Sequence, residues 1–248
     1  MRMLWPTPLD DVTDDDLERL YGYPRDLDRP WVQVNFVASA DGAATLDDAS
    51  EGLSSPADKR IFLLGRDLAD VVLVGAGTAR AEGYRGARTN PERQARRRRL
   101  GLSGLPPIAV VSGSARIDPS SALFTDTKVP PIVITTAAAP EDRRAALAEA
   151  GADVLIAGEQ MIDLTAALKE LSARGLRRID CEGGPHLFGE LIAEDLVDQL
   201  CLTVAPVLAG AAGPRIAMGR TASEPHRLQL ESILYEDGFS MLRYRKAA

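Results

Sequence analysis

Short apolar runs, separated by polar and glycine-containing loops, recur along most of this chain. Residues 71–74 (Val-Val-Leu-Val) form one such run, with no polar residue in it, as expected for a strand buried on both faces of a sheet. Similar runs predict further strands at 31–38, 107–112, 131–136, 153–156, 178–181 and 200–205. Helical periodicity predicts helices at 56–68, 141–150, 164–174 and 186–194.

This alternation of strands and helices predicts an α/β fold whose sheet is mainly parallel, with helices on both faces. The chain ends in two strand-like runs, 227–235 and 239–245, joined by a Glu-Asp-Gly turn, which predicts an antiparallel hairpin and therefore a mixed sheet. Residues 1–30 are rich in Asp and Pro and are expected to form an N-terminal arm. Residues 31–248 are expected to form a single domain.

Two glycine turns follow predicted strands, and each precedes a predicted helix. The first contains Gly75 and Gly77, which let the backbone approach a ligand closely, and Thr78, which is a good N-cap for a helix beginning at residue 79. The second is Glu182-Gly183-Gly184-Pro185. In a doubly wound sheet both turns open at the carboxyl edge of the strands, where ligands bind. Together they could bind a diphosphate through free helix amides, although one short glycine motif alone is equally typical of an ordinary strand-to-helix turn.

The first turn differs from a Rossmann dinucleotide motif, because Arg80 stands where a third glycine is expected. No strand ending in Asp or Glu follows at the spacing needed for a ribose ligand. The region is instead rich in arginine, and the next predicted strand leads into Ser112, Ser114 and Arg116. Such groups suit a 2′-phosphate, so NADPH is favoured over NADH as cofactor.

Composition and charge exclude several function classes. The 248 residues carry a net charge of −7, with 45% hydrophobic and 26% charged residues, which is typical of a globular protein and argues against general polyanion binding. The arginine-rich segment 93–99 is typical of a solvated, mobile region, and it lacks the interleaved aromatic residues that stack on bases, so no nucleic-acid partner is expected.

Cys181 and Cys201 lie in apolar runs and are expected to be reduced thiols in the cytoplasm. Neither a signal peptide nor an apolar run of about 18 residues is present, so no membrane association is expected. His186 and His226 are the only histidines, and neither has the neighbours that a metal site needs.

For two charged side chains, the sequence alone is compatible with two different roles. Arg66 lies near the end of the predicted helix 56–68, where it could compensate the helix dipole or contact a ligand. Asp41 lies in the turn that follows the strand 31–38, and it is equally typical of a turn residue or of an active-site carboxylate.

A series of motifs resembles the reductase domain of bacterial riboflavin biosynthesis, which is the C-terminal part of a bifunctional deaminase-reductase. The resemblance implies that this domain has a dihydrofolate-reductase-like fold. The resemblance covers residues 31–245. The motifs, in order, are Asn35–Gly42, the loop to Ser54-Ser55-Pro56, Arg66, Val74–Thr78, Glu182–Pro185 and Val204–Gly210.

The resemblance implies that NADPH transfers a hydride directly to a small-molecule substrate, 5-amino-6-(5-phosphoribosylamino)uracil, and reduces its ribosyl group to ribityl. It also implies a homodimer. The cofactor residues would be the glycine turns with Val37, Gly52 or Leu53, Thr78, Glu82, Ser112 and the run 184–190, which includes Pro185, His186 and Leu187. Ser50, Arg66, Arg88 and Glu182 would face the substrate, and Asp41, Glu182 or a bound water would supply the proton.

The chain departs from the family pattern at several positions. Asn35 replaces a lysine, Ala40 replaces a leucine, and Glu82–Arg88 replaces the Asp-Asn-Pro-x-Leu-Thr stretch that should hold the substrate phosphate. The zinc signature of the deaminase half is absent, so no metal is expected. Two alternatives therefore stay open: an enzyme that reduces dihydrofolate or another pterin on the same scaffold, and a non-catalytic NADPH-binding protein.

Overall fold

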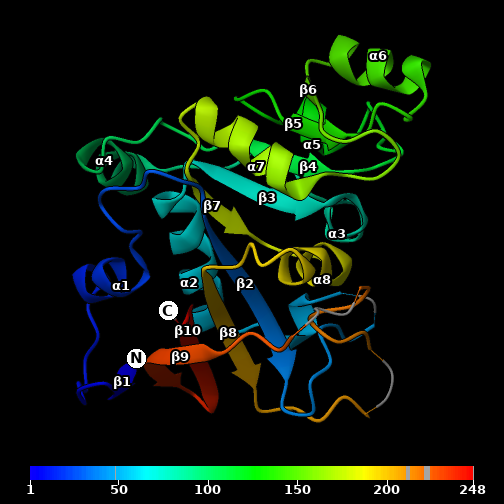
Figure 1. Cartoon of the computed structure of the whole chain (residues 1–248). Coiled ribbons are helices and arrows are strands. Elements are labelled where there is room, and N and C mark those ends of the chain that lie inside the picture. Colours follow the sequence, from blue (N-terminus) through cyan, green and yellow to red (C-terminus); the bar gives the residue numbers. More distant parts are fainter. Residues whose placement is uncertain (48, 211–212, 221–223, 248) are drawn as a thin grey trace.

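The computed structural model describes residues 1–47, 49–210, 213–220 and 224–247. Within them the strands form one ten-stranded mixed sheet in the order β1-β9-β10-β8-β2-β7-β3-β4-β5-β6 (Figure 1). The seven neighbouring strands β8, β2, β7, β3, β4, β5 and β6 pair in parallel. Strands β10, β9 and β1 extend the sheet beyond β8 through antiparallel pairs. The bounds are β1 Arg2–Trp5, β2 Trp31–Ser39, β3 Val71–Gly75, β4 Ile108–Val111, β5 Ile132–Thr135, β6 Asp153–Ile156, β7 Arg178–Cys181, β8 Gln199–Ala205, β9 Leu228–Glu236 and β10 Phe239–Lys246.

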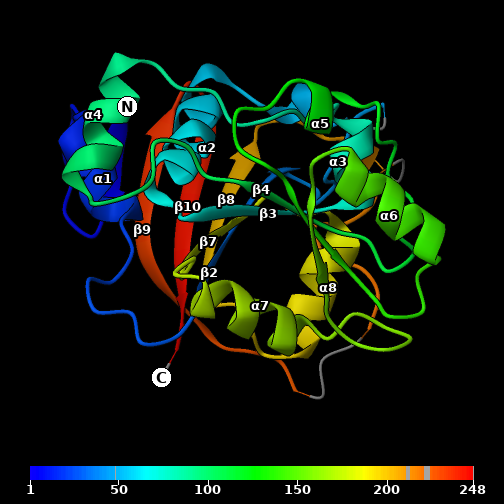
Figure 2. The same ribbon diagram turned by 90° about the horizontal axis from the view of Figure 1, so that it is seen from above.

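Helices cover both faces of this sheet, as the view from above shows (Figure 2). Helices α7 and α8 lie on one face, whereas α1 and α2 lie on the other, together with α3, α5 and α6. The bounds are α1 Asp14–Tyr21, α2 Pro56–Leu68, α3 Ala76–Ala81, α4 Pro91–Arg99, α5 Ala122–Thr125, α6 Glu141–Glu149, α7 Leu164–Ala173, α8 Pro185–Ala193 and the 3₁₀ turn η1 Glu51–Leu53.

Strand β3 shows why the sheet is buried on both faces. Val71 and Leu73 pack into the cluster under α7 and α8, while Val72 and Val74 pack into the cluster on the opposite face. All four side chains are fully buried. Because successive side chains of a strand point to opposite faces, a continuous apolar run is what a two-sided core requires. The predicted α/β fold, with its mainly parallel sheet and C-terminal antiparallel hairpin, is confirmed.

The N-terminal segment contributes to the sheet as well as to the surface. Within the predicted arm, β1 pairs with β9 in antiparallel register, and Leu17 and Tyr21 of α1 pack against α2. Thr13 caps α1 in a reciprocal capping box with Asp16. The predicted boundary at residue 30 stays a prediction.

The arginine-rich segment is helical, so the prediction of a solvated, mobile region was wrong. Asn90 caps α4 at its N-terminus, and Pro91 begins its first turn. Arg97 is 1% exposed and donates to the carbonyl oxygens of Arg66, Asp67 and Ala69 at 2.9, 3.1 and 2.8 Å. These carbonyls lie at the C-terminal end of α2, where backbone acceptors lack intrahelical partners. The segment is therefore held in place by a helix end that the local sequence does not reveal.

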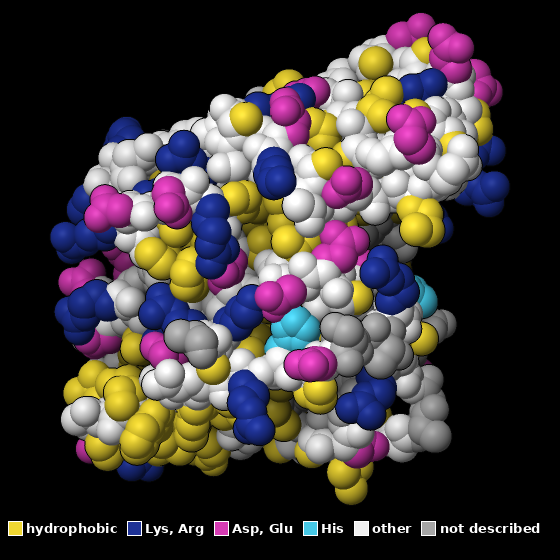
Figure 3. Space-filling view, in the orientation of Figure 1, with side chains coloured by type: hydrophobic (Ala, Val, Ile, Leu, Met, Phe, Trp, Pro, Cys, Tyr) yellow, Lys and Arg dark blue, Asp and Glu magenta, His cyan; other side chains and the backbone are white. Residues whose placement is uncertain are grey.

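The surface is mixed in character (Figure 3). Hydrophobic side chains gather near the end of the sheet formed by β1 and β9, where Leu4, Trp5 and Tyr235 are exposed. No described helix has both the length and the apolarity needed to cross a bilayer. Cys181 and Cys201 are free and buried, and burial raises the pKa of each thiol to about 12.

Candidate functional site

The two glycine turns lie against each other at the carboxyl edge of the sheet. Strands β3 and β7 are neighbours, and where they end the amide of Gly75 donates to the carbonyl oxygen of Gly183 at 2.8 Å. Thr78 lies inside α3, whose N-cap is Gly75, so the predicted N-cap role of Thr78 was wrong. The chain passes directly from extended Gly75 into helix at Ala76, which brings Thr78 into the first turn, facing Gly184.

Close packing in this region requires glycine at two positions. Gly183 has a φ of +87°, and a Cβ there would lie 2.7 Å from Cζ of Phe36. A Cβ at Gly184 would collide with Oγ1 of Thr78. The peptide bond between the two glycines is cis. The turn that precedes α8 is therefore wedged between β2 and α3.

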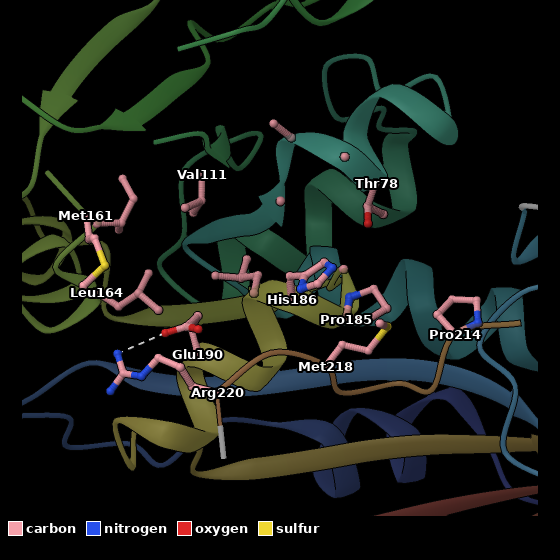
Figure 4. Close-up of a pocket in the computed structure, with 16 residues that line it drawn as sticks. Thr78, Val111, Met161, Leu164, Pro185, His186, Glu190, Pro214, Met218 and Arg220 are labelled. Carbon is pink, nitrogen blue, oxygen red and sulfur yellow. Dashed lines mark hydrogen bonds and ion pairs between the residues drawn. The ribbon is translucent and has the colours of Figure 1, made fainter. Parts of the chain in front are cut away.

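A cavity of about 730 Å³ opens beside these turns (Figure 4). Its walls come from the glycine turns, from the ends of β4 and α7, and from the segment around Met218. Val111, Ile162 and Leu164 make one side apolar. At the other side Arg220 donates to Glu190 at 3.2 Å. The volume lies within the range of cavities that bind small molecules and cofactors.

Most residues predicted to bind the cofactor line this first cavity. They are Gly75, Gly77, Thr78, Gly184, Pro185, His186 and Leu187. Gly183 does not line this cavity, but its carbonyl oxygen accepts from the Gly75 amide of the other turn. Val37 and Glu82 line a second cavity. Neither cavity is lined by Ser112, Gly52 or Leu53, and Leu53 is packed in a small core with Val37. The structure thus brings together the two glycine turns but leaves two predicted cofactor residues, Gly52 and Leu53, outside both cavities.

The second cavity, of about 430 Å³, lies on the α2 side of the glycine turns. The predicted substrate residues Ser50, Arg66 and Glu182 line it. Arg88 does not, because its guanidinium pairs with Asp126 instead. Thr78, Gly184, Pro185 and Pro214 line both cavities, so the two spaces meet at these residues.

Arg66 and Glu182 form a bidentate ion pair at the wall of the second cavity. Nε and Nη2 of Arg66 donate to Oε1 and Oε2 of Glu182 at 2.5 and 2.7 Å, and the Tyr84 hydroxyl donates to Oε2 at 2.6 Å. Burial lowers the pKa of Arg66, but the charge of the Glu182 carboxylate and its hydrogen bonds have a larger effect, so the pKa of Arg66 is raised overall. Burial, and then the charge of Glu182, raise the pKa of Tyr84 well above its ordinary value. The arrangement therefore holds an ionised Arg66 and a protonated Tyr84.

A second carboxyl group lies behind this ion pair. Asp180 of β7 is fully buried against Gly65 of α2, where a Cβ would lie 2.7 Å from Oδ2. Burial, and then the charge of Glu182, raise the pKa of Asp180 well above its ordinary value. Both effects favour the uncharged form of Asp180, which limits repulsion of Glu182.

Asp41 lies outside both cavities. Its carboxylate accepts from the Ser39 hydroxyl at 2.5 Å and from the amides of Ala209 and Gly210 at 3.0 and 2.7 Å. The Ser39 hydroxyl, and then the Ala209 amide, lower the pKa of Asp41 to about 2. Of the two interpretations that the sequence left open, the geometry favours a turn residue, which ties the loop after β8 to the end of β2.

The profile of the RibD C-terminal domain matches residues 30–236, more than three quarters of the chain. The chain belongs to the RibD C-terminal domain family. A relative named 2,5-diamino-6-ribosylamino-4(3H)-pyrimidinone 5′-phosphate reductase, from Archaeoglobus fulgidus, is 29% identical over 203 residues, covering 81% of this chain and 92% of the relative. The riboflavin biosynthesis protein RibD of Mycobacterium tuberculosis is 28% identical over 190 residues, 76% of this chain but 45% of that protein.

Solved structures of related proteins have the same fold. A pyrimidine reductase-like protein from Corynebacterium diphtheriae superposes with a TM-score of 0.80 at 30% identity, covering 88% of this chain and 92% of that one. The riboflavin biosynthesis reductase of Saccharomyces cerevisiae has a TM-score of 0.69 at 16% identity, covering 93% and 98%. Membership of the RibD C-terminal domain family confirms the predicted resemblance and the prediction of an oxidoreductase of the riboflavin-biosynthesis type. The predicted roles of individual residues stay predictions.

Sequence reasoning missed several residues that line the two cavities. Tyr84 follows a glycine in a polar loop, and an aromatic residue in that position was the available signal. The first cavity also contains Met161, Pro214, Met218 and Arg220, which come from loops with no motif of their own. The segment of Met218 and Arg220 reaches the site because it packs beside α8, where the Met218 amide donates to the Pro185 carbonyl at 3.0 Å and Arg220 pairs with Glu190, and no local pattern indicates these contacts.

Proposed function

We propose that the chain is an NADPH-dependent reductase that converts the ribosyl group of a ribosylaminopyrimidine 5′-phosphate into a ribityl group. The observation that carries the proposal is the meeting of the two cavities at Thr78, Gly184, Pro185 and Pro214. Hydride transfer needs a cofactor and a substrate held in contact at one point, and two adjoining cavities provide such a point. The names of the relatives support a pyrimidine substrate.

Two pyrimidines are candidates. One is 2,5-diamino-6-ribosylamino-4(3H)-pyrimidinone 5′-phosphate, after which the relatives with the higher coverage are named. The other is 5-amino-6-(5-phosphoribosylamino)uracil, which the family resemblance implies. Their rings differ only at C2, which carries an amino group in the first and an oxygen in the second. We propose the first as the preferred substrate.

The first cavity fits the cofactor. The backbone amides of His186 and Leu187 lie in the first turn of the nine-residue helix α8, where amides have no intrahelical acceptor and can bind a phosphate. The apolar wall formed by Val111, Ile162 and Leu164 can pack against a flat base. A Cβ at Gly77 would contact no other group, so the backbone there leaves open space for a ligand. When bound, NADPH supplies the hydride.

In the second cavity, Glu182 is the group best placed to orient the substrate. Its carboxylate is fixed by Arg66 and Tyr84, yet a carboxylate has about four acceptor sites and can still accept from a substrate N–H or O–H. Arg66 and Ser50 border the same space. These contacts would hold the ribosyl carbon C1′ against the junction of the cavities.

The reaction also needs one proton, which goes to the ring oxygen as that oxygen leaves C1′ and the hydride arrives. Asp41 lies outside the cavities, and its pKa of about 2 leaves it ionised near neutral pH. Glu182 is a carboxylate in a bidentate pair with Arg66. Of the three proton donors considered from the sequence, we therefore favour a water molecule in the second cavity.

The proposal is tested by following the absorbance of reduced nicotinamide after the purified protein is mixed with each pyrimidine. We expect turnover with NADPH, slower turnover with NADH, and a ribityl product identified by mass spectrometry. Turnover of dihydrofolate but of neither pyrimidine would replace this function by pterin reduction. Tight NADPH binding without turnover of any of the three compounds would indicate a non-catalytic NADPH-binding protein.

We also propose a cytoplasmic homodimer. Two buried, unbridged thiols support a reducing compartment. The family resemblance supports the dimer, and the exposed apolar side chains of β1 and β9 are compatible with a buried interface. Sedimentation equilibrium should give twice the mass of the chain, and a single-chain mass would contradict the dimer.

A further inference from the structure

Asp180 is a buried carboxyl group that the proposed chemistry does not yet use. Both of its oxygens are buried, and neither has a hydrogen-bond partner among the described residues. Gly65 of α2 lies directly against it, since a Cβ there would lie 2.7 Å from Oδ2 and 3.1 Å from Oδ1. A buried polar group without a partner is rare in proteins, and bound water or a role in the chemistry is its usual explanation.

Three buried donors near Asp180 also lack a partner within the part of the chain that the structure describes. They are the Tyr23 hydroxyl, Nε2 of Gln33 and Nδ2 of Asn35. Gln33 is the register partner of Asp180 on β2, and Asn35 follows it on the same face of that strand, at the wall of the second cavity. Burial, and then the nearby Asp180, raise the pKa of Tyr23 well above its ordinary value. Donors without acceptors therefore adjoin an acceptor without donors, and buried water can bridge them, because such a water usually makes about three hydrogen bonds.

Asp180 also has no cation of its own. The titratable and charged groups that face it are Glu182 of its own strand, Arg66 of α2, Tyr23 after α1 and the Cys201 thiol of β8. Arg66 is the one cation among these four, and Glu182 accepts from it at 2.5 and 2.7 Å. Two carboxyl groups on one face of β7 thus share a single cation that is already paired. Glu182 carries the negative charge, and Asp180 keeps its proton.

We infer that Asp180 is the proton reservoir of the candidate site, and that buried water between Asp180 and Asn35 carries its proton into the second cavity. This inference rests on the proposed function, in which each turnover consumes one proton. Asp180 would act through water and would touch neither the substrate nor the cofactor, since it lines neither cavity.

The transfer balances in protons and electrons. Asp180 gives its proton to the bridging water, which releases a proton to the water beside the substrate. The ring oxygen takes that proton as its bond to C1′ breaks, and the hydride forms the new C1′–H bond. The Asp180 carboxylate that remains can accept from the bridging water and from the otherwise unpaired donors, until a proton from solvent restores the acid.

The first test compares the pH dependence of kcat in the wild-type protein and in Asp180→Asn. The amide is close in shape to the acid but has no proton to release, so solvent must supply it. We expect the wild-type kcat to be nearly constant between about pH 6 and 8, and the kcat of D180N to fall by about tenfold per pH unit. KM should stay within about twofold, because Asp180 lines neither cavity. A role in packing alone would change stability without changing this slope.

Asp198→Asn is the matched control. Asp198 is also a buried aspartate outside the lining of both cavities, but Arg29 pairs with it at 2.6 Å. D198N should therefore keep the wild-type pH dependence of kcat. The inference is overturned if kcat of D180N follows the wild-type profile, or if D198N shows the same fall as D180N.

Infrared spectroscopy separates this inference from the proposed function, because it needs neither substrate nor turnover. Near neutral pH the wild-type protein should show a carboxylic-acid C=O band that shifts when the aspartate carboxyl carbons are isotopically labelled, and D180N should lack it. The labelled wild-type spectrum is decisive even if D180N does not fold, since absence of an aspartic-acid band overturns the inference. If the band is present but neither pyrimidine is reduced, the proposed function fails, whereas the stored proton of Asp180 is supported.

Discussion

The amide of Gly75 donates to the carbonyl oxygen of Gly183 at 2.8 Å, and this bond joins the two glycine turns of the chain. The turns are far apart in sequence but follow neighbouring parallel strands, so they reach the same edge of the sheet. Both proposed ligands depend on this junction, because residues of the two turns line both cavities. The contact between the turns is therefore the structural basis of the proposed site.

Substituting Gly184 by alanine should disrupt this junction. A Cβ at that position would collide with Oγ1 of Thr78, so the Thr78 side chain or the backbone must shift to relieve the clash. We expect G184A to lose about 1–3 kcal/mol of stability and to bind NADPH at least tenfold more weakly. Urea denaturation and fluorescence titration with NADPH measure the two effects.

Two further variants test the cause of that loss. Thr78→Ala added to G184A removes the colliding oxygen and should restore most of the stability. Gly104→Ala is the control, since a Cβ there contacts nothing within 4 Å. If the double variant is no more stable than G184A, the clash with Thr78 does not explain the effect.

The sequence predicted the parts of the fold and site that depend on local pattern. The unbroken apolar run of β3 indicated a doubly buried strand, and the glycine turns indicated the edge of the sheet at which the two cavities lie, because parallel strands end at one edge. The family motifs indicated Arg66 and Glu182, which form a pair. Their mutual contact and the position of Tyr84 could not be predicted, since both depend on how α2 packs on β7.

The contacts of Arg97 and Asp41 could not be predicted either, because they also depend on the tertiary fold. A run of arginines has the composition of a solvated segment, yet Arg97 is buried because the end of α2 offers carbonyl acceptors. Asp41 is equally typical of a turn residue and of an active-site carboxylate in sequence, and its carboxylate accepts from the backbone amides of residues 209 and 210. In both cases the partner is backbone distant in sequence, whose position only the tertiary fold determines.

Removing the positive charge of Arg66 should destabilise the protein strongly. Arg66→Met would leave Glu182 as a buried carboxylate without its cation, at a cost of about 3–5 kcal/mol. Adding Glu182→Gln removes the uncompensated charge, so the double variant should recover part of this loss. Urea denaturation of the two single variants and the double variant gives the coupling energy. Additive effects would show that the two side chains do not interact as the geometry indicates.

Asp41 should contribute to stability in a defined pH range. Hydrogen bonds from Ser39 and from the amide of Ala209 lower its pKa from 3.8 to about 2, so the folded protein favours the ionised form. A carboxyl group with a lowered pKa stabilises the fold above its unfolded pKa and loses this effect as the pH falls through the folded pKa. Asp41→Asn should therefore be less stable than wild type above about pH 4, and the difference should shrink towards pH 2.

Thermal denaturation over a pH series measures this difference. The same variant distinguishes the two interpretations of Asp41, because a turn residue would leave the pH dependence of kcat between about pH 6 and 8 unchanged. A stability difference that is independent of pH would contradict the role of the ionised carboxylate. A shifted pH profile of kcat would instead assign Asp41 to the chemistry.

Arg97 should contribute more to stability than any exposed arginine of the same helix. Its guanidinium donates to three carbonyl oxygens at the end of α2 and, at 2.6 Å, to the carbonyl of Ser103, and Arg97→Ala would leave these buried acceptors unpaired. We expect a loss of about 2–4 kcal/mol in urea denaturation, the range typical of a broken buried polar network. Arg98→Ala removes an exposed neighbour of equal charge and should change stability by less than about 0.5 kcal/mol. Because both variants lower the net positive charge of α4 equally, equal stabilities would mean that the contacts with α2 do not hold the segment in place.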